Sequence, residues 1–124
     1  MTPGEVPADV RRFILTSIPS VPYLEAVLLL RGEPAHAWGT DMLARRLYVP
    51  KRTAAELLAQ LAASGIATPG TADVRYAPNA ELSGLLDRLA AAYAADLVAV
   101  TDLIHSRIDK RAQQFADAFR FRKE

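Results

Sequence analysis

The sequence predicts a mainly α-helical protein with one small two-stranded β-hairpin. Ala and Leu, both strong helix formers, supply 23 and 16 of the 124 residues. Apolar residues recur every three or four positions through most of the chain, which is the spacing of helices that bury one face. Only residues 66–78 break this pattern, with two short strand-like segments around a turn that contains Pro69 and Gly70. The hydrophobic share of 51% is typical of a globular chain.

Two helices are expected before residue 33. The first covers residues 10–18, after the capping residue Asp9, and Pro19 ends it. The second restarts at Ser20, because a proline is tolerated in the first turn of a helix, and it closes at Gly32. Leucine and valine occupy most of its circumference, so this second helix is expected to be buried.

The next two helices are separated by three residues. Thr40 caps a helix over 41–47, and a second helix covers 51–64 and ends at Gly65. Trp38 is expected to pack beneath the start of the first of these helices. Segments 66–68 and 74–76 then form the hairpin. Two helices, a tight turn and a hairpin, in this order, are typical of a winged helix-turn-helix domain.

Residues 43–66 resemble the core of MarR-like winged-helix regulators. The shared features are Leu-Ala-x-x-Leu at 43–47, a short turn, a second helix with matching inward leucines, and Gly-Ile before the wing. The resemblance implies a homodimeric transcriptional regulator that inserts the second helix into the major groove of DNA. The DNA-facing positions that it implies are Lys51, Arg52, Thr53, Ala55, Glu56, Ala59 and Gln60. The neighbouring basic residues Arg45, Arg46 and Arg75 complete the predicted DNA-binding set.

Two features depart from the family pattern. Ala55 stands where a polar residue is usual, and Glu56 stands where a basic one is usual. A carboxylate at position 56 weakens DNA binding unless it pairs with Arg52, four residues earlier on the same helix face, or accepts from a cytosine amino group. Arg75 is the hairpin's sole basic residue. These features leave a second hypothesis open, a winged helix that binds another protein and does not bind DNA.

A long helix is expected after Asn79, from residue 80 through at least 105. Apolar residues from Leu82 to Phe119 recur at a mean spacing of 3.7 residues, close to the period of a straight helix. A winged helix over residues 1–78 is too small to cover this helix along its whole length. The segment 79–124 is therefore expected to be a dimerisation helix and tail. Its predicted interface residues are Tyr93, Leu97, Val100, Leu103, Ile104 and Ile108.

Composition and spacing argue against several classes of function. The absence of Cys excludes disulfides, thiol nucleophiles and zinc–thiolate sites. Asp102, His105 and Asp109 share one helix side, but this pattern is commoner on a solvated face than at a metal. No catalytic constellation is present, so we expect neither an enzyme nor a cofactor. The longest apolar run, Leu89–Ala95, is too short to cross a membrane, and the N-terminus lacks a signal sequence, so a cytoplasmic protein is expected.

Overall fold

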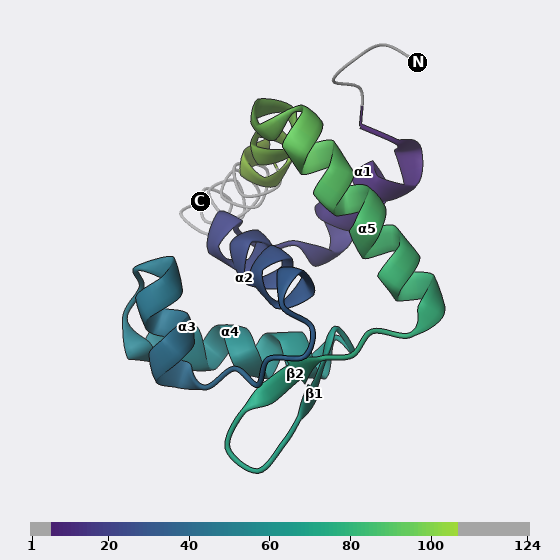
Figure 1. Cartoon of the computed structure of the whole chain (residues 1–124). Coiled ribbons are helices and arrows are strands. Elements are labelled where there is room, and N and C mark those ends of the chain that lie inside the picture. The colour runs from purple at the N-terminus through teal and green to yellow at the C-terminus, as the bar shows by residue number, and fades with distance from the viewer. Residues whose placement is uncertain (1–5, 107–124) are drawn as a thin grey trace, which may run out of the picture. The chain divides into compact units, whose positions relative to one another are not determined.

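The computed structural model of the chain describes residues 6–106 (Figure 1). These residues form two compact units. One unit runs from Pro22 to Asp87, and the other combines the N-terminal segment up to Val21 with the segment from Arg88 onward. This division differs from the expected one at residue 78, because the N-terminal helix groups with the C-terminal segment.

The unit of residues 22–87 begins with a buried helix. Helix α2 (Val21–Gly32) buries side chains on most of its faces, and these are Tyr23, Leu24, Ala26, Val27 and Leu30. The nearly continuous apolar run explains this burial, because a helix with no polar face is stable only inside a core. The Tyr23 hydroxyl lies 3.1 Å from the Ser64 hydroxyl, so its polar end also has a partner.

Helices α3 (Thr40–Leu47) and α4 (Lys51–Ala63) pack against each other and are joined by a three-residue turn. Their buried residues are Leu43, Ala44, Ala54, Leu57, Leu58 and Leu61, whereas Leu47, which is also expected to face inward, is half-buried. Gly39 precedes α3, and no side chain caps that helix, so the expected cap at Thr40 is wrong. Gly65 follows α4 with a φ of +81°, a backbone conformation that glycine adopts without strain.

The hairpin follows α4 directly. Strands β1 (Ala67–Pro69) and β2 (Val74–Tyr76) are antiparallel, with Ala67 opposite Tyr76 and Pro69 opposite Val74. On the other side of β2, Trp38 pairs with Val74 through two backbone hydrogen bonds of 2.7 and 2.9 Å. The segment before α3 therefore adds one residue of strand to the hairpin. Trp38 itself is fully buried, as the sequence predicts.

The coarse prediction of a mainly helical chain with a small antiparallel hairpin is confirmed. The order α2, a single strand residue, α3, α4, β1 and β2 is compatible with a winged helix. Asn79 then starts helix α5 (Ala80–Ala95), since its side-chain oxygen accepts the Leu82 N–H at 2.8 Å.

The expected continuous helix from residue 80 to 105 is wrong. Helix α5 ends at Ala95, and a second helix, Leu97–Ser106, leaves it at an angle of 112° (Figure 1). Asp96 makes this break. Its N–H still donates to the Ala92 carbonyl at 2.9 Å, while its side chain accepts the Ala99 N–H at 3.0 Å. One residue thus completes α5 and caps the next helix.

This bend separates the predicted interface residue Tyr93 from the others, which come after it in the sequence. Val100 and Ile104 are fully buried, whereas Leu97 remains 53% exposed. Tyr93 and Leu103 are half-buried, and Ile108 lies outside the described residues. The expectation that the rest of the chain is too small to bury the predicted interface residues is therefore wrong for Val100 and Ile104.

Helix α1 (Ala8–Ser17) buries Val10 and Ile14 in the unit that also contains residues 88–106. The expected cap at Asp9 is wrong, because the helix begins at Ala8 after Pro7 and Asp9 lies within its first turn. The Asp9 carboxylate pairs there with Arg88 at 2.7 Å. Hydrogen bonding by Arg88 lowers the pKa of the Asp9 carboxyl. Among residues 6–106, no single helix is long and apolar enough to span a membrane, although two bent pairs of consecutive helices together reach that length and hydropathy.

Candidate nucleic-acid interface

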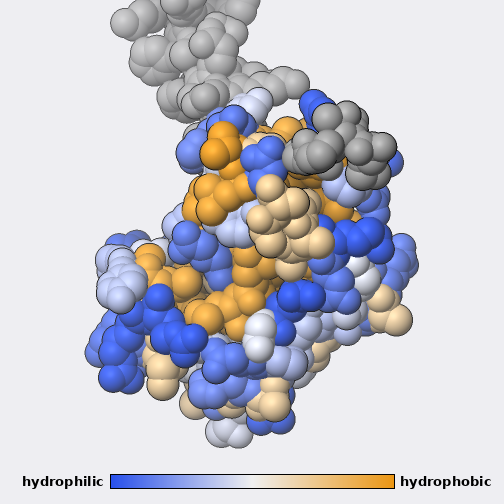
Figure 2. Space-filling view, turned by 45° about the horizontal axis from the view of Figure 1, so that its top comes forward, coloured by the Kyte–Doolittle hydropathy of each residue, from blue (hydrophilic) through white to orange (hydrophobic). Residues whose placement is uncertain are grey.

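The predicted DNA-binding residues lie on three elements of the 22–87 unit. Arg45 and Arg46 occupy the last turn of α3, and Arg75 lies on β2. The remaining residues are on α4, where all are exposed except the half-buried Thr53: Lys51, Arg52, Thr53, Ala55, Glu56, Ala59 and Gln60. Figure 2 shows hydrophilic residues over the region where Figure 1 places α3, next to hydrophobic ones.

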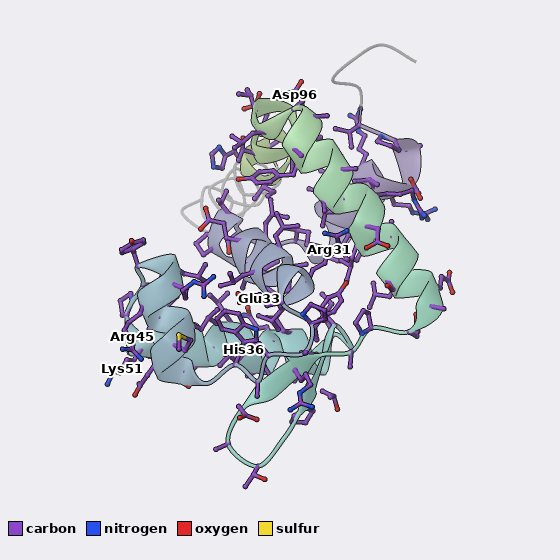
Figure 3. All side chains as sticks on the ribbon, viewed as in Figure 1. Arg31, Glu33, His36, Arg45, Lys51 and Asp96 are labelled. Carbon is purple, nitrogen blue, oxygen red and sulfur yellow. The ribbon has the colours of Figure 1, made fainter. Side chains whose placement is uncertain are left out.

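Arg45 and Lys51 come together where α3 ends and α4 begins (Figure 3). They line a shallow depression of about 360 Å³ together with Asp41 and Ala44. Pro50 precedes α4, and no side chain caps that helix. The first N–H groups of α4 therefore add partial positive charge to this end of the helix.

Two of the cations on α4 are paired with carboxylates. Lys51 Nζ lies 3.3 Å from Asp41 Oδ1, and Arg52 Nε lies 3.5 Å from Glu56 Oε1. The second pair is the one that the four-residue spacing predicts, so pairing of Glu56 with Arg52 is confirmed. The Arg52 side chain is 91% exposed even in this pair, and such surface pairs contribute only about 0–1 kcal/mol. Both cations can therefore exchange their carboxylates for another anion.

Arg46 is engaged differently from its neighbour Arg45. Its Nη2 lies 3.1 Å from Glu33 Oε2, and its guanidinium carbon is 5.4 Å from the centre of the Trp38 ring. His36 also contacts Trp38: the two rings meet edge to face, with their centres 4.5 Å apart. Arg46 thus ties the loop after α2 to α3, and Arg45 has no ion-pair partner among residues 6–106.

The hairpin offers little positive charge. Arg75, opposite Thr68, is exposed and has no ion pair within the described part of the chain. The turn between the two strands holds Asp73, whose carbonyl accepts the Gly70 N–H at 2.6 Å. Over residues 22–87 the sequence has six basic and seven acidic residues, so this unit carries a net charge of −1.

Tyr48, in the turn between α3 and α4, is the residue of this surface that sequence spacing does not identify. It follows α3 with a φ of +57° and a ψ of +45°, and its side chain is 95% exposed. The left-handed conformation after a helix is usually taken by glycine, so the absence of a glycine after α3 is the sequence signal that marks this position. A tyrosine at that position, two residues before Pro50, is an exception to the rule.

A second polar cluster lies away from the predicted residues. Arg31 at the end of α2 forms a 2.9 Å ion pair with Asp87 of α5. Burial, and then the negative charge of Asp87, raise the pKa of the Tyr76 phenol, while Arg31 and the Ser83 hydroxyl act in the opposite direction. The Tyr76 hydroxyl is shielded from solvent and has no hydrogen bond of good geometry among residues 6–106.

Within residues 6–106, no three His, Asp or Glu side chains gather as metal ligands. Asp109, the third member of the trio considered from the sequence, lies outside the described residues. Neither a protein-family model, a curated protein nor a solved structure matches this chain.

Proposed function

We propose that residues 22–87 form a winged helix-turn-helix that binds duplex DNA, and that the chain acts as a homodimeric transcriptional regulator. The observation that carries this proposal is the exposure of Arg45, Lys51 and Arg52 around the turn that leads into α4. In helix-turn-helix proteins, the N-terminal part of the second helix enters the major groove, and cations beside it contact phosphates.

The ion pairs on α4 are compatible with this role. A phosphate can replace Asp41 beside Lys51, because both members of that pair are largely exposed. Glu56 faces the same direction as Arg52 and reduces the positive charge of the helix. We therefore expect modest affinity from one copy of the domain.

A homodimer compensates for the small number of cations. Two copies double the phosphate contacts and present two second helices to half-sites about 34 Å apart, one turn of the DNA helix. In this proposal, Leu97 at the start of the Leu97–Ser106 helix is part of the dimer contact, because it remains exposed.

The second candidate function is a winged helix that binds another protein. The net charge of −1 over residues 22–87 favours it, because phosphate contacts supply most of the affinity of DNA-binding domains. The hairpin supports it as well, since its turn carries Asp73 and no basic residue.

Retention on mixed genomic DNA fragments, measured over a range of salt concentrations, separates the two functions. The regulator is retained at low salt and released as salt rises, because binding displaces counterions from DNA. Absence of retention even at low salt contradicts the DNA-binding proposal and leaves the protein-binding candidate.

A matched pair of variants locates the interface. Changing Lys51→Ala with Arg52→Ala is expected to lower affinity and to flatten the salt slope by about one unit for each phosphate that the variant no longer neutralises. The control changes Arg11→Ala with Arg12→Ala on α1, two exposed residues whose replacement removes the same charge. Equal effects of the two double variants mean that only net charge matters and that α4 is not the interface.

A further inference from the structure

Tyr48 is held in a conformation that disfavours its side chain. Its φ of +57° and ψ of +45° lie in the left-handed region, where the Cβ atom of an L-residue approaches the following carbonyl oxygen. Among residues 6–106, it is the one non-glycine residue with a positive φ. A glycine at this position would form the same turn without that strain.

The turn around Tyr48 is nevertheless well defined. The N–H groups of Tyr48 and Val49 both donate to the carbonyl of Ala44, the second at 3.1 Å. Pro50 follows with a fixed φ and leads directly into α4. The phenol therefore projects from a fixed point between the two helices.

Burial does not compensate for the strain. Tyr48 is 95% exposed, whereas the next most exposed large hydrophobic residue among those described, Val98, is 63% exposed. The ring thus gains almost no contact with its own chain. The left-handed strain at this fully exposed aromatic side chain is the observation that points to a contact outside the chain.

The surroundings of Tyr48 favour an anionic partner. In the sequence, Arg45 lies three residues before Tyr48 and Lys51 three residues after it, and both line the depression described above, together with Asp41 and Ala44. Arg45 has no carboxylate partner among residues 6–106, and Lys51 has only an exposed one. An exposed phenol on the turn that separates these two cations along the chain is compatible with a phosphate backbone as partner, because tyrosine is among the side chains that donate to phosphate oxygens.

We propose that Tyr48 contacts the DNA backbone at the edge of the groove that receives α4. The phenol O–H donates to a phosphate oxygen, and the ring packs against the adjoining sugar. This inference rests on the proposed DNA-binding function, in which the first helix crosses the backbone and the second enters the groove. The turn between the two helices then lies at the phosphates.

Two substitutions test the contact. Tyr48→Gly is expected to raise the midpoint of urea unfolding, because it relieves the left-handed strain, and to lower affinity for DNA about tenfold by removing a hydrogen bond to a charged group. Tyr48→Phe keeps the ring and is expected to lose part of that affinity. Neither change should alter the salt slope, because the phenol is neutral, whereas Lys51→Ala should flatten it.

Leu15→Ala is the control, since it removes an exposed hydrophobic side chain from α1 in the other unit. If the unmodified protein is not retained on DNA, both the proposed function and the contact are overturned. If the unmodified protein is retained and Tyr48→Gly binds DNA equally well, the contact alone is overturned. Loss of a protein partner by Tyr48→Gly, with unchanged DNA binding, assigns Tyr48 to a protein interface and also overturns this inference.

Discussion

At the residue scale, Arg45 and Arg46 show how two adjacent and chemically identical residues take different roles. Both belong to the basic set that the sequence predicts at the DNA interface. Arg46 is tied to Glu33 and Trp38, whereas Arg45 lines the depression at the start of α4. The difference depends on where the loop after α2 passes, which no local pattern specifies.

Alanine substitution should separate the two arginines. Arg46→Ala is expected to lower the free energy of unfolding by about 1 kcal/mol, because it removes a surface ion pair and a cation–π interaction. Arg45→Ala should leave stability unchanged and reduce affinity for DNA. Urea unfolding and DNA titration of both variants check this expectation, and equal decreases in stability would contradict it.

The raised pKa of the Tyr76 phenol predicts that the stability of the fold depends on pH in the alkaline range. Burial raises the pKa of its phenol in the folded state, so the folded protein holds this proton more tightly than the unfolded chain does. The resulting stabilisation is complete below the ordinary value of 10.0 and is lost as the pH rises through the raised value.

Urea unfolding between about pH 8 and pH 11, a range that brackets the ordinary phenol value, should therefore show a falling stability that Tyr76→Phe reduces. Tyr48→Phe is the matched control, since it removes a phenol that is exposed. An identical alkaline profile for Tyr76→Phe and the unmodified protein would show that Tyr76 does not cause the fall.

At the element scale, the turn signals of the sequence predict α3, α4 and the hairpin to within one or two residues. Pro50, Gly65 and Asn79 lie at the ends of these short segments, so few other boundaries are possible for the helices and the hairpin. Arg52 and Glu56 are four residues apart on one helix, so their pairing is also predictable. The pairs of Lys51 with Asp41 and of Arg46 with Glu33 join different elements, and sequence spacing cannot identify them.

The break at Asp96 is absent from the sequence prediction for a specific reason. The apolar residues on both sides keep a spacing of three or four, because each helix buries one face. A mean spacing of 3.7 residues over this region therefore describes two helices as well as one. The signal that does mark the break is one capping aspartate after an alanine-rich segment.

Asp96→Ala tests the role of this cap. We expect a decrease of about 1 kcal/mol in the free energy of unfolding, the usual cost of removing a helix cap. Asp96→Asn should retain most of the stability, because its amide oxygen can accept the same Ala99 N–H. Denaturation followed by circular dichroism compares the variants, and an Asp96→Ala protein as stable as the unmodified one would show that the bend needs no cap.

At the scale of the whole molecule, the proposed homodimer depends on a smaller surface than the sequence indicates. Val100 and Ile104 are already buried within one copy. The exposed apolar side chains near the bend are Leu97 and Val98, at 53% and 63%. These two adjacent residues are therefore the ones that can be changed without disturbing the core.

The double change Leu97→Asp with Val98→Asp is expected to convert the dimer into a monomer with an unchanged circular dichroism spectrum. Charged groups at two exposed positions cost the isolated chain little, but they would be desolvated and repel one another across a two-fold contact. Ile104→Asp is unsuitable as a test of association, because it places a carboxylate in a fully buried position and would unfold the helix.

Light scattering at micromolar concentration should show the mass halved in the double variant. DNA affinity should fall with it, because a monomer binds only one half-site. A monomeric unmodified protein would contradict the homodimer itself, whereas a double variant that remains dimeric would place this helix outside the dimer contact.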